Sequence, residues 1–405
     1  MRTVYLDHSA TTPIRPEVVE AMHPYFMDIY GNPSSIHAFG REARKALEDS
    51  REQVAAILGA SPEEIVFTSG GTEATNLAIK GAVRAHGKPG SRIITSSIEH
   101  HATLHTCRYL ERNGFEVVYL PVDRYGKVNP SDVEEAITER TVLISIMHAN
   151  NEVGTIEPIE EIGDIARSRG VPFHADAVQS VGKIPVRVDK LKVDFLSLSG
   201  HKIYGPKGIG ALYARRGVPF EPLFQGGHHE SNRRPGTENV PAIVGLARAM
   251  ELAEAEMSVV SRRERNLVAF LWDAIQTRIE EVHLNGHPFD RVPPILNVSF
   301  DFVDGESVIL NLDLKGIAAS TGSACTSGAV EPSHVLLAMG IPRSRAQGAV
   351  RFSLGRETTQ EDLDYTVEVL VETVTRLRSM SPAYADRKRG RKRHTGSFPL
   401  TSLKG

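Results

Sequence analysis

Between about residues 60 and 215, short runs rich in β-branched and aromatic residues alternate with segments of helical pattern, and this alternation limits the possible folds more than any other feature of the chain. The predicted strands are EIVFTS, RIITSS, FEVVYL, VLISIM, VPFHAD, VDFLSLS and GIGALYA. Two intervening segments, ATLHTCRYLERNG and PIEEIGDIARSRG, end in glycine, as helices commonly do. We therefore predict an α/β fold with a mainly parallel, mixed sheet covered by helices.

The helical pattern becomes long after about residue 240, and further strand and helix signals follow it. We predict a large domain over residues 15–260 that binds the ligand. Residues 1–14 and 261–380 are predicted to form a smaller α+β domain, with a cysteine-bearing loop at 320–332. In parallel sheets ligands bind at the carboxyl ends of strands, so the residues that follow the predicted strands are the first candidates for a site.

Residues 381–405 differ from the rest of the chain. Their basic run RKRGRKRH, residues 387–394, has no apolar periodicity, which predicts a disordered tail. An electrostatic contact of this tail with RNA or an acidic protein stays open.

Charge and cysteine content exclude several classes of protein. The net charge of −3 over 405 residues gives no general attraction to nucleic acid or membrane, so no direct nucleic-acid partner is expected. The N-terminal MRTVYLDHSATTP does not look like a signal peptide, and no apolar run approaches the ~20 residues of a membrane-spanning helix. The only cysteines, Cys107 and Cys325, exclude a disulfide framework and are typical of a reducing cytosol. We expect a cytoplasmic protein.

Lys202 follows the predicted strand VDFLSLS within the sequence SGHK. Most lysines lie on solvated faces, so a lysine at the end of a core strand indicates a chemical use, such as a Schiff base or a phosphate contact. Lys207 is the alternative lysine, but it follows Gly-Pro in a turn and is expected to be exposed.

The segment Ser69-Gly70-Gly71-Thr72 joins a predicted strand to a predicted helix. Its small residues allow backbone N–H groups to approach an anion, and the helix dipole adds partial positive charge there. The segment lacks the Gly-Lys-Ser/Thr ending of a P-loop and does not match GxGxxG. The simpler interpretation is a tight turn with Thr72 as a helix cap.

Other polar residues also follow predicted strands. Asp176 ends the strand VPFHAD, and Gln179 comes three residues later. A buried carboxylate needs a partner, which could be a protonated ring nitrogen of a cofactor, although a helix N-cap is the alternative. His100 and Asn151 follow two further strand ends. The convergence of such residues at one edge of a sheet is stronger evidence for a functional site than any single residue.

These residues fit pyridoxal phosphate, which needs a lysine, an acid on the pyridine nitrogen, a group over the ring and donors for its phosphate. We assign Lys202 to the Schiff base, Asp176 to the ring nitrogen, and His100 to the ring face and to general-base chemistry. The residues assigned to the phosphate are Gly71, Thr72, Ser199 and His201. A metal site is the competing account of the histidines, but the adjacent pairs at 100–101 and 228–229 lack the i, i+4 spacing of a zinc-binding helix.

Two further residues carry possible chemistry. Cys325 lies in STGSACTSGAV, which has the composition of a loop, so we predict an exposed and reactive thiol, whereas Cys107 lies mid-helix and is predicted to pack. Arg351 lies inside an apolar strand and can bind a substrate carboxylate bidentately. Arg356, which follows that strand, is interpreted as a surface salt bridge.

The motifs as a set closely resemble the NifS/IscS class of cysteine desulfurases over about residues 4 to 360. They are YLDHSATTP, GNPSSIHAFG, FTSGGTEATNLAIKG, HANNEVGTI, HADAVQSVGK, SLSGHKIYGPKGIG, RRPGTENV, STGSACTSGAVEPSHVL and VRFSLGRETT. The resemblance implies a fold-type I pyridoxal phosphate enzyme that acts as a homodimer. It implies L-cysteine as substrate, with L-alanine and an enzyme persulfide as products.

The resemblance also implies roles for individual residues. It supports Lys202 as the Schiff-base lysine, His100 as the histidine of the EH motif, and Asp176 with Gln179 as the residues that hold the pyridine ring. Asn151 matches a residue near the cofactor oxygen and the substrate.

Three further roles follow from the same resemblance. Arg351 matches the arginine that binds the substrate carboxylate. Thr237 matches a phosphate contact that the family takes from the partner subunit. Cys325 matches the cysteine whose thiolate attacks the substrate sulfur and then carries the persulfide.

The sulfur acceptor stays open at this point. The SACTSG setting is similar to the branch that passes sulfur to an iron–sulfur scaffold, in which this cysteine, Cys325 here, can briefly ligate the cluster. The basic run 387–394 replaces the tail by which housekeeping members dock their scaffold, so the acceptor could also be a tRNA-thiolation enzyme or another carrier. The alternatives are a selenocysteine lyase or aminotransferase on the same fold, and a catalytically silent assembly subunit.

Overall fold

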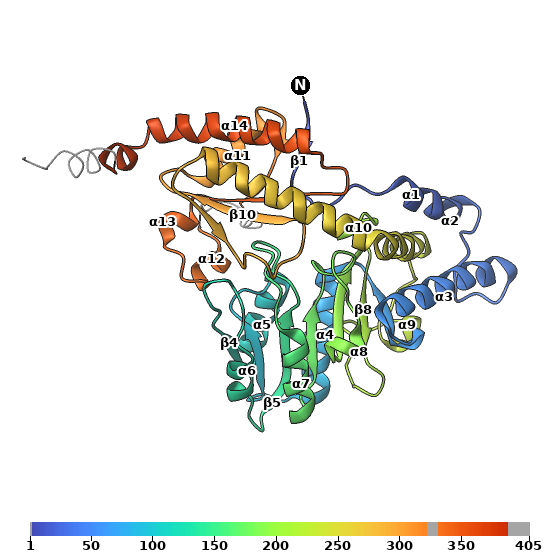
Figure 1. Cartoon of the computed structure of the whole chain (residues 1–405). Coiled ribbons are helices and arrows are strands. Elements are labelled where there is room, and N and C mark those ends of the chain that lie inside the picture. The colour runs from blue at the N-terminus through green and yellow to red at the C-terminus, as the bar shows by residue number, and fades with distance from the viewer. Residues whose placement is uncertain (1, 322–330, 388–405) are drawn as a thin grey trace, which may run out of the picture.

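A seven-stranded sheet in the order β2-β8-β7-β6-β5-β3-β4 forms the larger part of the molecule (Figure 1). The protein is seen here as a computed structural model that describes residues 2–321 and 331–387. The strands are β2 (Ile65–Thr68), β3 (Arg92–Ser96), β4 (Glu116–Leu120), β5 (Thr141–Met147), β6 (Phe173–Asp176), β7 (Phe195–Ser199) and β8 (Gly210–Ala214). Strand β8 runs antiparallel to both of its neighbours, and the other neighbouring pairs are parallel. All seven predicted strands and the mainly parallel, mixed sheet are confirmed.

Helices cover both faces of this sheet, which explains why its strands are almost continuously apolar. Successive residues of one strand enter different cores: in β2, Ile65 and Phe67 belong to one apolar cluster and Val66 to another. The flanking helices are α3 (Ala38–Leu58), α4 (Gly71–His86), α5 (His101–Arg112), α6 (Pro130–Ala136) and α7 (Ile159–Arg169). Helix α7 ends as predicted at Gly170, whose φ of 65° is the left-handed conformation that glycine adopts without strain.

A smaller antiparallel sheet in the order β12-β10-β9 lies above the large sheet in Figure 1. Its strands are β9 (Val282–Asn285), β10 (Ile295–Phe300) and β12 (Ala349–Ser353), and it packs with α11 (Gly305–Asp313) and α14 (Gln360–Ser379). The N-terminal strand β1 (Val4–Tyr5) pairs with β11 (Ile317–Ala318), and Asp7 bridges to Ser353. The N-terminal segment therefore starts in a separate two-stranded sheet, bridges to β12 of the small sheet and runs toward the large one.

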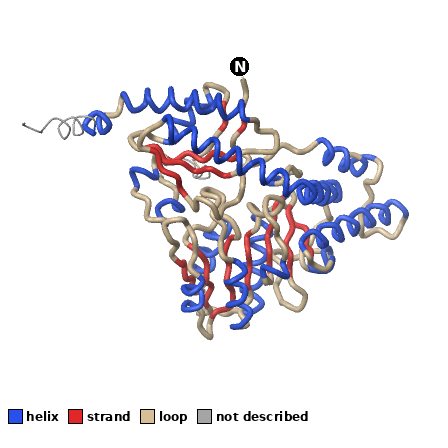
Figure 2. Tube along the Cα trace, viewed as in Figure 1, coloured by secondary structure: helices blue, strands red, loops and turns tan. Residues whose placement is uncertain are grey.

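The long helix α10 (Val240–Arg278) connects the two sheets (Figures 1 and 2). Met250, in its first half, belongs to the core of the large sheet, and Leu271, in its second half, belongs to the core of the small sheet. The division into domains near residue 260 stays a prediction.

Short helical segments complete the described chain. They are α1 (Pro16–Met22), α2 (Pro24–Met27), η1 (Pro62–Glu64), α8 (Val188–Leu191), η2 (Gly200–Lys202), α9 (His229–Asn232), α12 (His334–Ala338) and α13 (Arg343–Ala346). Residues 382–387, which the sequence analysis assigned to a disordered tail, are helical. The ring of Tyr384 packs 5.6 Å from that of Phe302 and lies under the guanidinium of Arg378, which holds this turn against the small sheet. Within residues 2–321 and 331–387, no helix combines the length and the apolar character needed to cross a membrane.

Candidate active site

A cavity of about 620 Å³ opens where β3, β5, β6 and β7 end, between the large sheet and the N-terminal segment. Ten of the predicted site residues line it: Gly71, Thr72, His100, Asn151, Asp176, Gln179, Ser199, His201, Lys202 and Arg351. Nine of them lie at or after the carboxyl ends of strands of the large sheet, which share one edge. The tenth, Arg351, comes from the small antiparallel sheet.

Lys202 ends η2, directly after the buried strand β7. Its Nζ donates hydrogen bonds to the carbonyl oxygens of Ser9, at 2.6 Å, and Ala10, at 2.7 Å. The N-terminal segment is tied to the same turn, because Thr12 donates through both its N–H and its hydroxyl to the carbonyl of His201. Lys207, the alternative lysine, is exposed as predicted.

Asp176 is buried at the end of β6, and its Oδ1 accepts a hydrogen bond from the N–H of Val178 at 3.0 Å. Burial raises the pKa of Asp176 to about 6, although the Val178 hydrogen bond and the charge of Lys202 act in the opposite direction. A buried carboxylate of this kind is stabilised by a cation, such as a protonated ring nitrogen, placed in the cavity.

His100 is the N-cap of α5, and its Nδ1 accepts a hydrogen bond from the N–H of Ala102 at 3.1 Å. A neutral imidazole that accepts at Nδ1 carries its hydrogen on Nε2. Burial, and after it the positive charge of Lys202, lowers the pKa of His100 to about 4. His100 is therefore neutral near pH 7, and it must give up the Ala102 hydrogen bond to take a proton at Nδ1.

Helix α4 presents its N-terminus to the cavity through Gly70, Gly71 and Thr72. The N-cap is Gly70, and no side chain caps the helix, so the simpler interpretation of Thr72 as a cap is wrong. The first N–H groups of a helix have no intrahelical acceptor, and here they combine with the helix dipole to favour an anion. A Cβ atom at Gly71 would come within 2.7 Å of Val178, which explains the glycine there.

Arg351 is buried in β12, and its guanidinium bridges two segments of the cavity wall. One nitrogen, Nη1, donates to the carbonyl of Asn151 at 2.9 Å, and Nη2 lies 2.8 Å from Oδ1 of Asp7. Arg356 instead forms partly exposed ion pairs with Glu256 and Glu357, which agrees with the surface salt bridge predicted for it. The two arginines thus differ in environment as the sequence predicted.

Thr237 and Cys107 do not line this cavity. Thr237 is exposed and lines a neighbouring cavity of about 180 Å³, which shares Ser69 and Gly208 with the larger one. Cys325 lies outside the described residues. Cys107 is fully buried in α5, so its predicted packing role is confirmed.

The N-terminal segment contributes groups that were not predicted from the sequence. Asp7 pairs with Arg351, and the carbonyls of Ser9 and Ala10 accept from Lys202. The motif YLDHSATTP is the available signal, but backbone acceptors leave no trace in side-chain identity. Among the described residues, no group of three or more His, Cys, Asp or Glu side chains is arranged to hold a metal ion.

The described residues fit pyridoxal phosphate. An uncapped helix N-terminus, a buried carboxylate with a raised pKa, a neutral histidine and a lysine at a strand end all border one cavity. They are the donors and charges that the phosphate, the ring nitrogen, the ring face and the aldehyde require.

Comparisons with known proteins agree with the pyridoxal phosphate site described above. The family described as Aminotransferase class-V matches residues 4–366. The cysteine desulfurase IscS of Dictyoglomus turgidum is 54% identical over 381 residues, which cover 94% of this chain and 97% of that protein. A solved structure described as a NifS-like protein has a TM-score of 0.87 at 41% identity and covers 92% of this chain and 100% of its own. Another, described as SspA in complex with cysteine, has a TM-score of 0.79 at 40% identity and covers 87% of this chain and 99% of its own.

Proposed function

This chain belongs to the cysteine desulfurases of the class-V aminotransferase family, and from this premise we propose how its own residues perform the reaction. It is a pyridoxal phosphate-dependent enzyme on a fold-type I scaffold, and its substrate is cysteine. The observation that carries the assignment of roles is the cavity in which Lys202, Asp176 and His100 meet the N-terminus of α4.

In the bound state, pyridoxal phosphate supplies the electron sink that lets bonds at the substrate carbons break. Lys202 would hold the cofactor covalently. Asp176 would pair with the ring nitrogen, and Gln179 lines the same cavity. The phosphate would be held at the N-terminus of α4 by residues that line the cavity there and after β7: Gly71, Thr72, Ser199 and His201.

Arg351 binds the carboxylate of the substrate. Its position in a buried strand fixes the guanidinium, and Asn151 lies next to it through the Nη1 hydrogen bond. A substrate carboxylate must share or replace the contact with Asp7. The orientation of the substrate therefore depends on both residues.

Two side chains in the cavity bear on proton transfer. Lys202, once displaced, is an amine within the site, and His100 is neutral near pH 7. Because its Nδ1 accepts from Ala102, the neutral His100 has only Nε2–H free, and this group would supply a hydrogen bond rather than accept a proton. The geometry therefore favours Lys202 as the base, in place of the general-base role predicted for His100.

Cys325, outside the described residues, is the proposed acceptor of the sulfur. Its thiolate attacks the substrate sulfur, the carbon–sulfur bond breaks with its electron pair left on carbon, and a sulfur–sulfur bond forms. The alanine carbon then takes a proton, and Cys325 holds the persulfide until an acceptor removes it. A Cys325→Ala variant should form no persulfide and pass no sulfur to a thiol acceptor. Normal transfer by that variant would refute the covalent step.

A second copy of this chain is the proposed partner. Large apolar side chains near the N-terminus are exposed, which is unusual for a monomer. They are Val19, Phe26, Met27, Tyr30, Ile36 and Phe39. In the proposed homodimer, Thr237 of each subunit contacts the phosphate in the site of the other.

Mixing variants tests this arrangement. Lys202→Ala and Thr237→Val subunits each lack one component. If Thr237 acts across the dimer, a mixed dimer contains one intact site, and co-expression should restore activity that neither variant has alone. No restoration in a purified mixed dimer would place Thr237 in its own subunit's site.

The acceptor is proposed to be an iron–sulfur scaffold or a tRNA-thiolation enzyme in the cytoplasm, with transient cluster ligation by Cys325 in the first case. A pull-down with and without residues 381–405, after labelling with sulfur-35 cysteine, would identify the acceptor and any role of the tail. Alanine release from cysteine without added keto acid, and at a higher kcat/KM than for selenocysteine, would separate the proposed function from a selenocysteine lyase, an aminotransferase and a silent subunit.

A further inference from the structure

Lys183 lies beside the active site, and neither the sequence motifs nor the proposed mechanism gives it a role. It follows Gly182 in the turn after β6, and Ser261 of α10 holds its backbone by donating to its carbonyl at 2.6 Å. Its Nζ donates to Oε1 of Gln179 at 2.7 Å. Lys183 therefore contacts Gln179, a residue of the proposed cofactor site, without lining the large cavity itself.

The contact belongs to a chain of hydrogen bonds that ends at Lys202. Nε2 of Gln179 donates to the carbonyl of Ser9 at 3.0 Å, and the same carbonyl accepts from Lys202 Nζ at 2.6 Å. Lys183 and Lys202 are thus linked through one buried amide and one backbone oxygen.

These hydrogen bonds fix both the oxygen and the nitrogen of the Gln179 amide. Lys183 occupies Oε1, and Ser9 accepts one of the two hydrogens of Nε2. Gln179 also lines the large cavity, so its remaining amide hydrogen is the group available there. A donor in this position stabilises an anionic oxygen on a ring held in the cavity.

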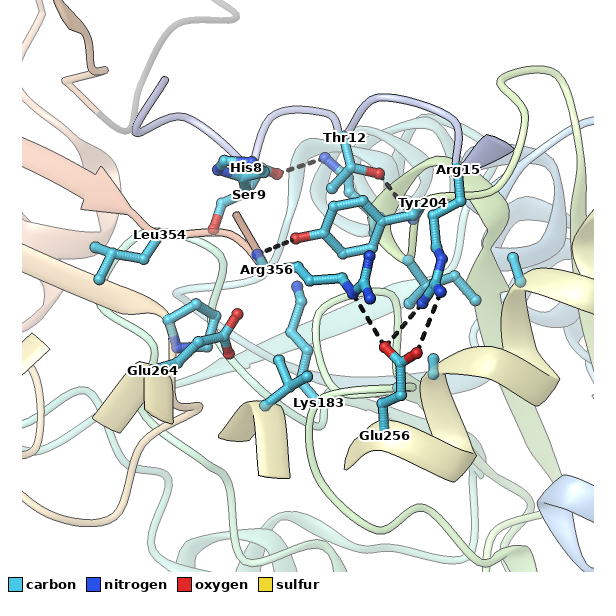
Figure 3. A pocket seen from close by; sticks show the side chains of 17 residues that line it. His8, Ser9, Thr12, Arg15, Lys183, Tyr204, Glu256, Glu264, Leu354 and Arg356 are labelled. Carbon is cyan, nitrogen blue, oxygen red and sulfur yellow. Dashed lines mark hydrogen bonds and ion pairs between the residues drawn. The ribbon is translucent and has the colours of Figure 1, made fainter. Parts of the chain in front are cut away.

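Lys183 itself lines a second, smaller cavity of about 40 Å³, which is large enough for a few water molecules (Figure 3). Figure 3 shows its amine between Glu264 of α10 and the ion-paired group of Arg15, Glu256 and Arg356. The charged and titratable side chains that line this cavity or act on Lys183 are His8, Arg15, His201, Lys202, Tyr204, Glu256, Glu264, Arg351 and Arg356.

Burial is the largest influence on the pKa values of Lys183 and Glu264. It lowers the pKa of Lys183 to about 7, with Lys202 acting in the same direction and Glu264 opposing it. It raises the pKa of Glu264 to about 7, against the effect of Lys183. Since coupling between two charges is reciprocal, a proton on Lys183 disfavours a proton on the nitrogen of Lys202.

We propose that Lys183 is a positioning residue for the desulfurase reaction: it locks the Gln179 amide with an N–H toward the cofactor and places positive charge behind Lys202. This inference rests on the roles proposed above for Gln179 and Lys202. Both effects act in one direction. Each makes the Lys202 nitrogen less basic, so that it more readily gives up its proton.

The test is the pH dependence of the visible absorbance of the holoenzyme, measured without substrate. In Lys183→Met the midpoint of the absorbance change should rise by about one pH unit, because the charge and the locked donor are both lost. Lys183→Arg, which keeps a charged donor, should stay close to the wild type. Lys190→Met, at an exposed position on α8, should leave the midpoint unchanged.

The outcomes separate this inference from the proposed function. An unchanged midpoint in Lys183→Met, or equal shifts in the Met and Arg variants, would refute the positioning role. If Lys183→Met does not fold, Lys183→Gln removes the charge and keeps a polar group, and it should move the midpoint in the same direction. No shift there also refutes the proposal. A wild-type holoenzyme whose cofactor is not attached to Lys202 would instead refute the proposed function.

Discussion

Nη2 of Arg351 lies 2.8 Å from Oδ1 of Asp7, so the guanidinium proposed to bind the substrate carboxylate already holds a carboxylate of the chain itself. Asp7 comes from the N-terminal segment, which bridges to β12 at Ser353. This pair ties the two ends of the sequence together at the edge of the active site. It also keeps a buried positive charge compensated when no substrate is present.

Replacing Arg351 tests its role in substrate binding. In Arg351→Lys the bidentate geometry is lost, and kcat/KM for cysteine should fall about 100-fold while cofactor absorbance is retained. Arg356→Lys is the matched control, since that side chain forms partly exposed ion pairs, and its kcat/KM should change less than about twofold. Equal effects of the two substitutions would contradict the assignment.

The turn before Thr237 is stabilised by a buried ion pair. Glu230, Ser231 and Asn232 all have positive φ values, of 48°, 56° and 65°, which are unfavourable for residues other than glycine. The carboxylate of Glu230 compensates with hydrogen bonds to Arg51, at 2.7 and 2.8 Å, and to the N–H of Phe67, at 2.9 Å.

Glu230→Gln should therefore reduce the free energy of unfolding by about 3 kcal/mol, because Arg51 remains buried without its buried charge partner. The measurement is urea unfolding of the holoenzyme. Glu48→Gln removes the half-exposed partner of the same arginine and should cost less than about 0.5 kcal/mol. Comparable losses in the two variants would mean that the buried Arg51–Glu230 pair contributes no more to stability than the half-exposed Arg51–Glu48 pair.

His174 predicts a specific pH dependence of stability. It is fully buried between two serines, with Ser145 Oγ at 2.9 Å from Nδ1 and Ser197 Oγ at 2.8 Å from Nε2, and burial lowers its pKa to about 3. In the unfolded chain His174 becomes protonated near pH 6.5, whereas in the folded chain it stays neutral until about pH 3. His174 therefore lowers the free energy of unfolding as the pH falls from 6.5 toward 3.

The comparison of wild type with His174→Gln isolates this effect from other titrating groups. The stability advantage of the wild type should shrink by about 1.4 kcal/mol per pH unit below 6.5. Denaturant unfolding at several pH values measures it. A difference that stays constant between pH 6.5 and 4.5 would show that the folded histidine titrates normally.

The two cysteines should differ sharply in reactivity. Burial raises the pKa of Cys107, which makes its thiolate scarce, and its side chain has no exposed surface. We expect iodoacetamide to label the native holoenzyme once, at Cys325, and a Cys325→Ala variant not at all. Peptide mapping measures this, and label on Cys107 in the native protein would contradict the predicted packing.

Strand–helix alternation was enough to predict the large sheet, because a sheet covered on both faces needs continuous apolar strands such as those of β5 and β7. Side chains at strand ends, such as Asp176 and Lys202, could be placed in one site for the same reason. The set of motifs then identified the family, which no single residue could have done.

Other contacts depend on tertiary structure that leaves little trace in the sequence. The carbonyls of Ser9 and Ala10 act through the backbone, so their residue types do not reveal that they hold Lys202. The cap on α4 could not be predicted from Thr72, because the turn places Gly70 at the N-cap. Lys183 lies within the motif HADAVQSVGK, but its contact with Gln179 is visible only in the structure.

The central claim is that pyridoxal phosphate is joined covalently to Lys202. The most direct measurement is reduction of the holoenzyme with borohydride, followed by digestion and mass spectrometry of the labelled peptide. The account predicts one phosphopyridoxyl group per chain, on Lys202. A label on Lys207 or Lys183, or a reduced protein with no label, would contradict it.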